Sequence, residues 1–404
     1  MQRLRIAYVV QRYGMEVNGG SETHCRTLAE HLARHHDVQV LTTRAIDYVT
    51  WKDEYPEGSV TINGVAVHRF GVDLPRDPAQ FAEICDNILV KSHSASDEVR
   101  WMKMQGPYST SLLTHLERHR NKYDVVLFQT YLYATTYFGL PLVKDRAILI
   151  PTAHDELPIY LGIFDKLFRE PRYVLCLSPE ERAFLVRRFF DVDLRAEVIG
   201  AGIEPPAEPA PDMDWQTIRA QLGSSPFIVY VGRIDESKGC KTLADYFVRY
   251  LEGAAHPDLK LLLIGKAVMQ VPSHPNIVLG GFVPESTKLW AIRECRFMVA
   301  PSPYESLCIA ALESWLLGKP VLANGDCAVL RGQCIRSNGG LWYTDYEEFR
   351  EAMDYLLADG QIARALGTQG EAFVRANYTW EALDRRLPPI LASVAAAAAG
   401  SATA

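Results

Sequence analysis

The fold is decided by a strand–turn–helix unit that is clearest at residues 227–251, FIVYVGRIDESKGCKTLADYFVRYL. The unit begins with an apolar run at Phe227–Ile234 and continues into a helical pattern at Lys241–Leu251. The apolar run does not alternate with polar residues, which favours a strand buried on both faces of a parallel sheet. A chain that repeats such units is expected to form doubly wound sheets flanked by helices.

The same alternation extends along nearly the whole chain. We expect further strands at Arg5–Val10, Val38–Thr43, Val65–Val72, Asp124–Thr130, Arg146–Ala153, Tyr173–Ser178, Glu197–Gly202, Leu259–Gly265, Asn276–Phe282, Phe297–Ser302, Pro320–Asn324 and Leu341–Tyr343. Helical patterns fall between them, at Ser21–His35, Glu180–Phe190, Glu305–Leu317 and Glu347–Leu357. A last helix is expected from Trp380 to about Leu391, and the Ala-rich stretch Ala395–Ala404 predicts a frayed helix end followed by disorder.

A proline-rich segment at Gly202–Asp214 interrupts this pattern. It contains Pro205, Pro206, Pro209 and Pro211, which neither a helix nor a central strand accommodates, so we interpret it as a linker. The linker divides the chain into two halves, each long enough to bury its own core. The sequence therefore predicts an α/β protein with two domains facing each other across a cleft, and a ligand site at the carboxyl ends of the strands.

Composition excludes several classes of protein. The 404 residues are 48% hydrophobic and 23% charged, and the net charge of −7 argues against a dedicated nucleic-acid binder. The chain has no apolar run of the roughly 18 residues that a transmembrane helix needs, and it starts without a secretory leader pattern. The eight cysteines form no C-x-x-C pair and no zinc-ligand spacing with histidines. We expect a cytoplasmic protein with reduced thiols.

The segment richest in candidate chemistry runs from Pro301 to Cys308, PSPYESLC. A strand is expected to end near Ser302 and a helix to begin near Glu305, so that free backbone N–H groups would form an anion site suited to a diphosphate. Glu305 and Glu313 would then lie about 12 Å apart along that helix, at roughly 1.5 Å per residue. This separation is comparable to the reach from a sugar across a pyrophosphate to a ribose. A first-turn glutamate and an unrelated surface glutamate would give the same pattern by chance.

A second candidate segment follows the strand at Phe227–Ile234. Gly232 permits close approach of the backbone, and Arg233 with Lys238 could hold phosphate oxygens. A solvated charged turn would have the same sequence. Because no G-x-G-x-x-G pattern follows a strand, a dinucleotide oxidoreductase is disfavoured.

Motifs in the first half complete an ordered set. Gly19-Gly20-Ser21-Glu22 follows the first strand, His154-Asp155 follows the strand that ends at Ala153, and Val198–Glu204 forms a strand and turn. With Gly232-Arg233, Lys238, Glu305, Glu313 and Gly318-Lys319-Pro320-Val321, the set resembles glycosyltransferase family 4, which contains retaining enzymes of the GT-B fold. The resemblance covers almost the whole chain, from Ile6 to about Leu391. It departs from the family at Ser306 and Cys308, where glycines are usual.

The resemblance implies a GT-B architecture of two Rossmann-like domains. Residues 1–205, with the C-terminal helix 378–404, would bind the acceptor. Residues 206–377 would bind the nucleotide-sugar donor. The stretch from Tyr48 to Ser109 would belong to the acceptor domain, where Tyr48, Trp51, Tyr55, Phe81, Trp101 and Tyr108 either line a sugar-binding wall or form the core of an irregular subdomain.

The resemblance also implies a role for each site residue. Arg233 and Lys238 would neutralise the diphosphate leaving group, Glu305 would bind hydroxyls of the donor sugar, and Glu313 would bind the ribose. His154 would lie near the face of the sugar and either assist departure of the diphosphate or orient the acceptor. Donor contacts would also come from Gly19, Gly20, Gly232 and Val283, and from the backbone amides of Ser306, Leu307 and Cys308.

The implied activity is transfer of a hexose from a UDP- or GDP-linked sugar to a hydroxyl of a glycan, glycolipid or small molecule, as in bacterial surface polysaccharide biosynthesis. No cofactor and no metal would be needed, because Arg233 and Lys238 would replace the cation. The two D-x-D sequences, Asp191-Val192-Asp193 and Asp212-Met213-Asp214, are interpreted as loop acids. Residues Arg187–Phe190 could contact a membrane surface peripherally, although a basic helix end is commonly just solvated.

Other activities share this fold. A nucleotide-sugar epimerase or a glycan phosphorylase is the main alternative to a transferase. An epimerase would release no free nucleoside diphosphate, and a phosphorylase would need a pyridoxal-phosphate lysine pocket. A non-catalytic nucleotide-sugar-binding subunit is a further alternative.

Overall fold

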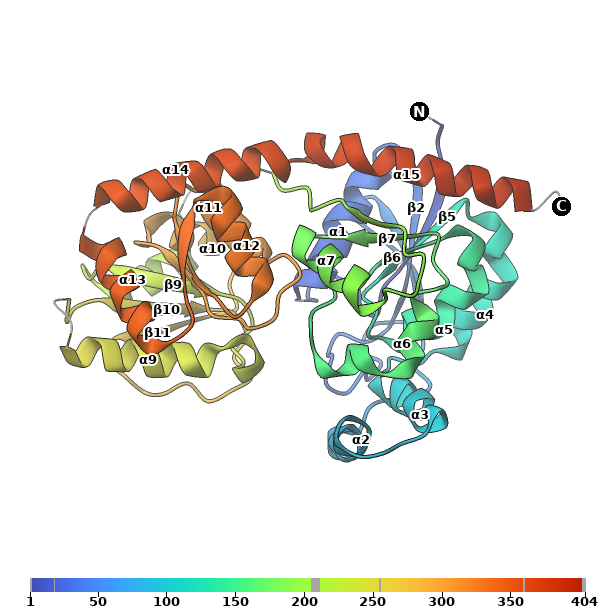
Figure 1. The fold of residues 1–404 in the computed structure, drawn as a ribbon, viewed down its shortest axis with the longest axis horizontal. Helices are drawn as coiled ribbons and strands as arrows, with labels where there is room; N and C mark the ends of the chain where they lie inside the picture. Colours follow the sequence, from blue (N-terminus) through green and yellow to red (C-terminus); the bar gives the residue numbers. More distant parts are fainter. Residues whose placement is uncertain (1, 18, 205–210, 254–255, 359, 402–404) are drawn as a thin grey trace. The chain divides into compact units, whose positions relative to one another are not determined.

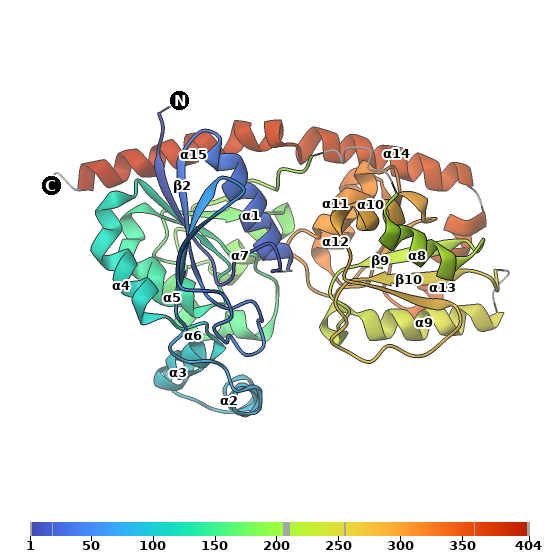
Figure 2. The same cartoon turned by 180° about the vertical axis from the view of Figure 1, so that it is seen from behind.

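The structure is a computed structural model that describes residues 2–17, 19–204, 211–253, 256–358 and 360–401. It contains two compact units, which consist of Met1–Gly202 with Leu383–Ala404, and of Ile203–Ala382 (Figures 1 and 2). The boundaries expected from the sequence were 205/206 and 377/378. Part of the expected linker, residues 205–210, lies outside the described residues.

The first unit is built on an eight-stranded sheet in the order β3-β4-β2-β1-β5-β6-β7-β8. Every pair of neighbours is parallel except β3 and β4, which are antiparallel. The strands are β1 (Arg5–Val9), β2 (Asp37–Thr43), β3 (Gly58–Ile62), β4 (Val65–Phe70), β5 (Val125–Gln129), β6 (Ala147–Ile150), β7 (Tyr173–Cys176) and β8 (Ala196–Val198). The helices are α1 (Gly20–Ala33), α2 (Pro78–Val90), α3 (Ala95–Gln105), α4 (Thr110–His119), η1 (Arg120–Lys122), α5 (Ala134–Gly139), η2 (Leu140–Arg146), η3 (Leu157–Tyr160), α6 (Gly162–Leu167), α7 (Pro179–Arg188) and most of α15 (Trp380–Ser401).

The second unit is built on a six-stranded parallel sheet in the order β11-β10-β9-β12-β13-β14. Its strands are β9 (Phe227–Val231), β10 (Lys260–Ile264), β11 (Ile277–Gly281), β12 (Met298–Ala300), β13 (Val321–Asn324) and β14 (Gly340–Tyr343). Its helices are α8 (Met213–Leu222), η4 (Glu236–Lys238), α9 (Cys240–Gly253), α10 (Glu285–Glu294), α11 (Ile309–Leu316), α12 (Ala328–Ser337), α13 (Tyr346–Ala358) and α14 (Gly360–Asn377). Within this unit, α9 and α13 cover one face of the sheet, and α10, α11 and α12 cover the other (Figure 1).

The expected burial of the strands is confirmed. In β9 the side chains of Phe227 to Tyr230 are all buried, and α9 buries Leu243, Phe247 and Tyr250 at the spacing of one helix face. Strands buried on both faces and helices buried on one stripe are what a doubly wound sheet requires. The predicted α/β class with two parallel-sheet domains is therefore confirmed.

Each sheet reverses its winding direction at one point. In the second unit the chain builds outward from β9 to β10 and β11, and then from β12 to β13 and β14 on the other side. In the first unit the corresponding reversal lies between β1 and β5. Ligands in open α/β sheets bind outside the carboxyl ends of the strands at such a switch point. In the second unit this location is occupied by the segments that follow β9 and β12.

The strands expected from the sequence are all present, but two expectations about local structure were wrong. The strand β3 was missed because its residues are largely exposed and carry no apolar run. The C-terminal tail was expected to fray, whereas α15 continues to Ser401 through Pro388 and Pro389. Val394 and Ala398 are buried, so the tail is held by packing as well as by its alanines. Residues 402–404 lie outside the described part of the chain.

The aromatic residues between Tyr48 and Ser109 are partly core. Trp51 and Trp101 are buried, at 0% and 2% exposure, and the Trp51 ring nitrogen donates to the Gln105 carbonyl at 2.8 Å. Phe81 stacks on Trp101. For these side chains the structure favours a packed subdomain over a sugar-binding wall.

Helix α14 fixes the position of α11, the helix that carries Glu313. An added Cβ at Gly370 of α14 would lie 2.2 Å from Cδ1 of the fully buried Trp315 in α11. The two helices therefore pack closely where Gly370 faces the Trp315 ring.

We predict that Gly370→Ala lowers the free energy of unfolding by about 1–3 kcal/mol, because the added methyl overpacks against Trp315. Denaturant unfolding followed by tryptophan fluorescence measures the change. Gly253→Ala at the end of α9 is the matched control, since its Cβ would meet nothing within 4 Å. Equal stabilities of the two variants would contradict this account of the packing.

Candidate functional site

In the second unit, two loops meet where β9 and β12 end. The loop after β9 carries Gly232 to Gly239, and the loop after β12 carries Pro301 to Cys308. They touch at Gly239, which has a φ of 74° and whose Cβ, if present, would lie 2.2 Å from the carbonyl oxygen of Pro301. A left-handed backbone this close to another chain segment requires glycine. The two segments predicted to bind the donor are therefore neighbours.

An ion pair joins these loops. The ammonium of Lys238 lies 2.7 Å from Oε1 of Glu305, and it donates at 3.4 Å to the carbonyl oxygen of Tyr304. The two charged side chains are only 30% and 18% exposed. Burial disfavours the charged ammonium, but the charge and hydrogen bond of Glu305 outweigh burial and raise the pKa of Lys238. The site thus holds a fixed cation against a fixed carboxylate.

The loop after β12 does not have the predicted helical conformation. Helix α11 begins at Ile309 instead of Glu305, because Cys308 has a φ of 61° and interrupts the backbone before the first helical residue. Glu305 and Glu313 are therefore not two turns apart on one helix, and the estimate of about 12 Å along a helix axis does not apply.

The same loop is anchored in the core by Leu307. The Leu307 side chain is 2% exposed, and its carbonyl accepts a hydrogen bond of 2.6 Å from the buried side-chain amide of Gln333. This anchoring holds the backbone of Ser306, Leu307 and Cys308 in one conformation, next to the Lys238–Glu305 pair.

Glu313 lies in α11 and is paired with a lysine that the sequence analysis did not identify. Lys288 of α10 lies 2.7 Å from Oε1 of Glu313 and 2.7 Å from Oε1 of Glu285. Lys288 and Glu313 are 17% and 14% exposed, whereas Glu285 is 69% exposed. Burial raises the pKa of Glu313, and Lys288 opposes that rise. In the sequence, Lys288 shows only as an i, i+3 partner of Glu285 on one helix.

The other predicted donor residues of this unit surround the same edge of the sheet. Arg233 follows β9 and lies 2.8 Å from Oδ2 of Asp235, with its side chain 35% exposed. The positive charge of Arg233 also acts on Lys238 and disfavours the charged form of its ammonium group. Gly232 has a φ of 152°, and half-buried Val283 lies in the loop between β11 and α10.

In the first unit, the Gly19-Gly20 turn opens α1. A Cβ at Gly19 would lie 2.2 Å from Oε2 of Glu22, whereas a Cβ at Gly20 would meet nothing within 4 Å. Glu22 is buried and forms an ion pair of 2.6 Å with buried Arg12. The steric demand for glycine therefore lies at Gly19 in this structure, and Gly20 is exposed at the start of the helix.

The loops after β5 and β6 hold two threonines in the left-handed region of backbone space. Thr130 has a φ of 69° and Thr152 a φ of 48°. Such a conformation costs a β-branched residue roughly 1–3 kcal/mol and persists only where the surroundings enforce it. The hydroxyl of Thr152 donates to that of Thr130 at 3.2 Å. Backbone strain of this kind clusters at functional sites. Here the strained Thr152 lies two residues before His154.

His154 follows this strained segment and is held by a carboxylate. Its Nδ1 lies 3.1 Å from Oε1 of Glu156, and the same oxygen accepts a hydrogen bond of 3.1 Å from the hydroxyl of Tyr131. The His154 side chain is 27% exposed. A partner at Nδ1 fixes the ring orientation and the tautomer. The sequence analysis missed both Glu156 and Tyr131, although an acid two residues after the histidine was a visible signal.

The structure groups the predicted residues into two sets. Lys238 and Glu305 are in direct contact in the second unit, and Arg233, Glu313 and Val283 lie on neighbouring loops or helices of that unit. Gly19, Gly20 and His154 follow strands of the first unit.

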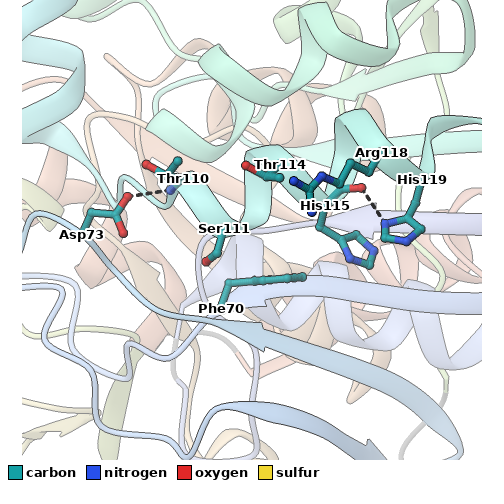
Figure 3. A pocket seen from close by; sticks show the side chains of 8 residues that line it. All are labelled: Phe70, Asp73, Thr110, Ser111, Thr114, His115, Arg118 and His119. Carbon is teal, nitrogen blue, oxygen red and sulfur yellow. Dashed lines mark hydrogen bonds between the residues drawn. The ribbon is translucent and has the colours of Figure 1, made fainter.

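A surface cavity of about 550 Å³ in the first unit lies beside α4 (Figure 3). Phe70, Asp73, Thr110, Ser111, Thr114, His115, Arg118 and His119 line it, and the Asp73 carboxylate accepts a hydrogen bond of 2.7 Å from the Thr110 amide. None of the predicted site residues lines this cavity.

The two D-x-D sequences have structural partners. Asp191 forms an ion pair with Arg169. Asp212 caps α8 and accepts hydrogen bonds from the hydroxyls of Ser286 and Thr287. Met213 and Asp214 were expected in the linker but lie in α8, because Asp212 starts a helix there. Among the described residues, no group of three or more His, Cys, Asp or Glu side chains could hold a metal ion.

The segment Arg187–Phe190 is only partly exposed. Phe189 is buried and stacks on Phe168, and Arg188 forms an ion pair of 2.9 Å with Asp165, while Phe190 is 86% exposed. In the described part of the chain, no helix combines the length and the apolar character needed to cross a bilayer.

Comparison with known proteins identifies the domain and the fold. Residues 225–359 match the family model described as glycosyl transferases group 1. A curated relative, alpha-maltose-1-phosphate synthase of Mycolicibacterium smegmatis, is 28% identical over 242 residues, which cover 51% of this chain and 59% of the relative. An uncharacterized glycosyltransferase of Methanocaldococcus jannaschii is 23% identical over 94% of this chain and 95% of its own length. The chain thus spans less than two thirds of the first of these relatives.

Two solved structures share the fold over nearly the full chain. Sucrose-phosphate synthase of Thermosynechococcus elongatus superposes with a TM-score of 0.72 at 19% sequence identity. The superposition covers 98% of this chain and 100% of the synthase chain. The protein HepE of Anabaena, crystallised with UDP-glucose, gives a TM-score of 0.70 at 14% identity and covers 97% and 100%. At these identities the likeness concerns the fold. Residues 225–359 thus resemble a glycosyl transferases group 1 domain, and the chain as a whole shares the fold of these structures. Its assignment to glycosyltransferase family 4 stays a prediction.

The Lys288–Glu313 pair gives a test of the site's electrostatics. We predict that Lys288→Met lowers the free energy of unfolding by roughly 3 kcal/mol near pH 8, because Glu313 is left as a buried carboxylate without its cation. The folded-state pKa of Glu313 then rises further, so the loss should shrink as the pH falls and the carboxyl takes up a proton.

Urea unfolding at pH 5 and pH 8 measures both effects. The control is Lys241→Met, which breaks an exposed pair with Asp245 and should leave the unfolding midpoint unchanged. A loss for Lys288→Met that is the same at both pH values would show that Glu313 is not the group left unpaired.

Proposed function

We propose that the protein is a retaining glycosyltransferase that moves a hexose from a UDP- or GDP-linked sugar to a hydroxyl of a glycan, glycolipid or small-molecule acceptor. The second unit binds the donor, and the first unit binds the acceptor. The observation that carries the proposal is the Lys238–Glu305 pair, which lies at the switch point of a glycosyl transferases group 1 domain. The UDP-glucose in the structure of Anabaena HepE supports a nucleotide-sugar donor.

In the proposed donor site, the diphosphate replaces Glu305 as the counter-ion of Lys238. In this structure the ammonium of Lys238 is paired with the carboxylate of Glu305. A diphosphate brings its own negative charge to Lys238 and Arg233, which frees the Glu305 carboxylate to accept hydrogen bonds from hydroxyls of the donor sugar. Backbone amides of Ser306, Leu307 and Cys308 bind the distal phosphate. Glu313, oriented by Lys288, binds the hydroxyls of the ribose.

The transfer step needs charge stabilisation more than a protein nucleophile. As the glycosidic C–O bond to the diphosphate breaks, negative charge grows on the leaving oxygen and positive charge on the sugar. Lys238 and Arg233 stabilise the former from fixed positions. The acceptor hydroxyl attacks from the same face, and its proton passes to the leaving diphosphate, so the anomeric configuration is retained. His154, with Nδ1 held by Glu156, assists departure of the diphosphate or orients the acceptor.

The proposal predicts nucleotide-dependent stabilisation without a metal. One of UDP, GDP and ADP should raise the melting temperature by several degrees, because a ligand at about 100 times its Kd contributes roughly 2.7 kcal/mol. EDTA should leave the shift unchanged, since Lys238 and Arg233 supply the positive charge. Differential scanning fluorimetry with each nucleotide, with and without EDTA, measures this. If none of the nucleotides shifts the melting temperature, the proposal that the second unit binds the donor is contradicted.

Glu305→Gln tests the chemistry at the same site. The variant keeps the shape of the side chain but loses its charge, so release of UDP from UDP-glucose should fall by about 100-fold or more while the fold is retained. Glu236→Gln, in the neighbouring η4, is the control and should turn over at the wild-type rate. Unchanged turnover in Glu305→Gln would exclude Glu305 from the mechanism, and sugar conversion without UDP release would point to an epimerase.

A further inference from the structure

The proposed mechanism leaves one buried carboxylate next to His154 without a role. Glu181 lies in the first turn of α7, and its side chain is 1% exposed. No cation pairs with it among the described residues. Its two oxygens instead accept hydrogen bonds from backbone amides, at 2.6 Å from Ala153 and at 2.6 Å from Leu177. A buried carboxylate is costly unless such bonds serve it, so its position is tightly defined.

These two bonds connect the ends of neighbouring strands. Ala153 belongs to the loop after β6 and immediately precedes His154, and Leu177 follows β7. The strands β6 and β7 are hydrogen-bonded neighbours in the sheet, and Glu181 ties their carboxyl ends together. The same loop contains Thr152 with its left-handed backbone. A strained residue needs such a restraint to stay in place.

The hydrogen bonds of Glu181 differ from those of an ordinary helix cap. Ser178-Pro179-Glu180-Glu181 has the S-x-x-E spacing of a capping box, and the Ser178 hydroxyl does accept a hydrogen bond of 3.2 Å from the Glu181 amide. In a capping box the glutamate would return to the amide of Ser178. Here the Glu181 carboxylate accepts hydrogen bonds from the amide of Leu177 and, across to the next loop, from the amide of Ala153.

We propose that Glu181 is a positioning residue for His154: its carboxylate fixes the backbone directly before the histidine through the hydrogen bond from the Ala153 amide. The proposal rests on the proposed function, in which His154 assists the transfer. Two titratable groups of neighbouring elements interact electrostatically with Glu181, His154 from the loop after β6 and the Cys176 thiol from β7. Of these, His154 favours the ionised carboxylate.

The ionisation of Glu181 makes the proposal measurable. Burial raises the pKa of Glu181 to about 7, against the backbone amides and His154, which favour ionisation. A change of charge or bonding at this carboxylate should therefore move the Ala153 amide and the histidine that follows it. A role confined to packing would leave the imidazole resonances of His154 unchanged.

The test uses Glu181→Gln in the full chain. Its amide keeps the size of the side chain, but it can accept from only one of the two backbone amides through its oxygen and carries no charge. We expect the imidazole resonances of His154, assigned in NMR spectra with His154→Asn, to change because the backbone before the histidine is released. We also expect UDP release from UDP-glucose to fall by roughly 10- to 100-fold. Glu117→Gln, an exposed carboxylate on α4, is the control and should change neither quantity.

A folded Glu181→Gln that retains both the wild-type imidazole resonances of His154 and the wild-type rate would overturn the proposal. If the variant does not fold, the wild-type protein decides instead. The amides of Ala153 and Leu177 should then shift together through one titration near pH 7 that also appears at His154. An ionisation of Glu181 that shifts these two amides without any change at the His154 imidazole would overturn the proposal.

Failure of the proposed function gives a different result. A wild-type protein that binds none of UDP, GDP and ADP, and releases no nucleoside diphosphate from a UDP- or GDP-linked sugar, would contradict the proposed transferase activity. The NMR titration would still report whether Glu181 sets the position of His154.

Discussion

The ion pair between Lys238 and Glu305 joins the loops after β9 and β12, and the candidate donor site is arranged around this contact. It forms because β9 and β12 are neighbours at the point where the sheet reverses direction. Gly239 lets the two loops touch at Pro301. Because both charges are largely withdrawn from water, removal of either partner leaves the other poorly solvated. The pair therefore keeps a cation in place before any ligand arrives.

The two sides of the proposed donor site follow one design. Each glutamate that the sequence singled out is held by a lysine from another element, Glu305 by Lys238 and Glu313 by Lys288. Under the proposed function, the anionic and hydroxyl groups of the ligand would replace partners in these pairs, so the charged side chains are already in place before the ligand binds. In the first unit the buried Glu181 is held by backbone amides instead, one of them at Ala153 directly before His154.

How far the sequence predicts this protein depends on the range of the interaction concerned. The alternation of apolar runs and helical patterns predicted the parallel strands, since burial on both faces leaves a local signature. The strand β3 escaped because it is exposed and pairs only at the sheet edge. The predicted start of α11 was wrong because the amino-acid types at residues 305–308 do not reveal the left-handed backbone of Cys308. Lys288 and Glu181 act across elements, and only the packed structure shows their partners.

The central claim is that the loops after β9 and β12 bind the diphosphate of a nucleotide sugar. A crystal structure of the protein with UDP tests it most directly. The account predicts the terminal phosphate at the ammonium of Lys238 and at the backbone amides of residues 306–308, with Glu305 released from Lys238 and the ribose at Glu313. A nucleotide bound elsewhere on the chain, with the Lys238–Glu305 and Lys288–Glu313 pairs intact, would contradict it.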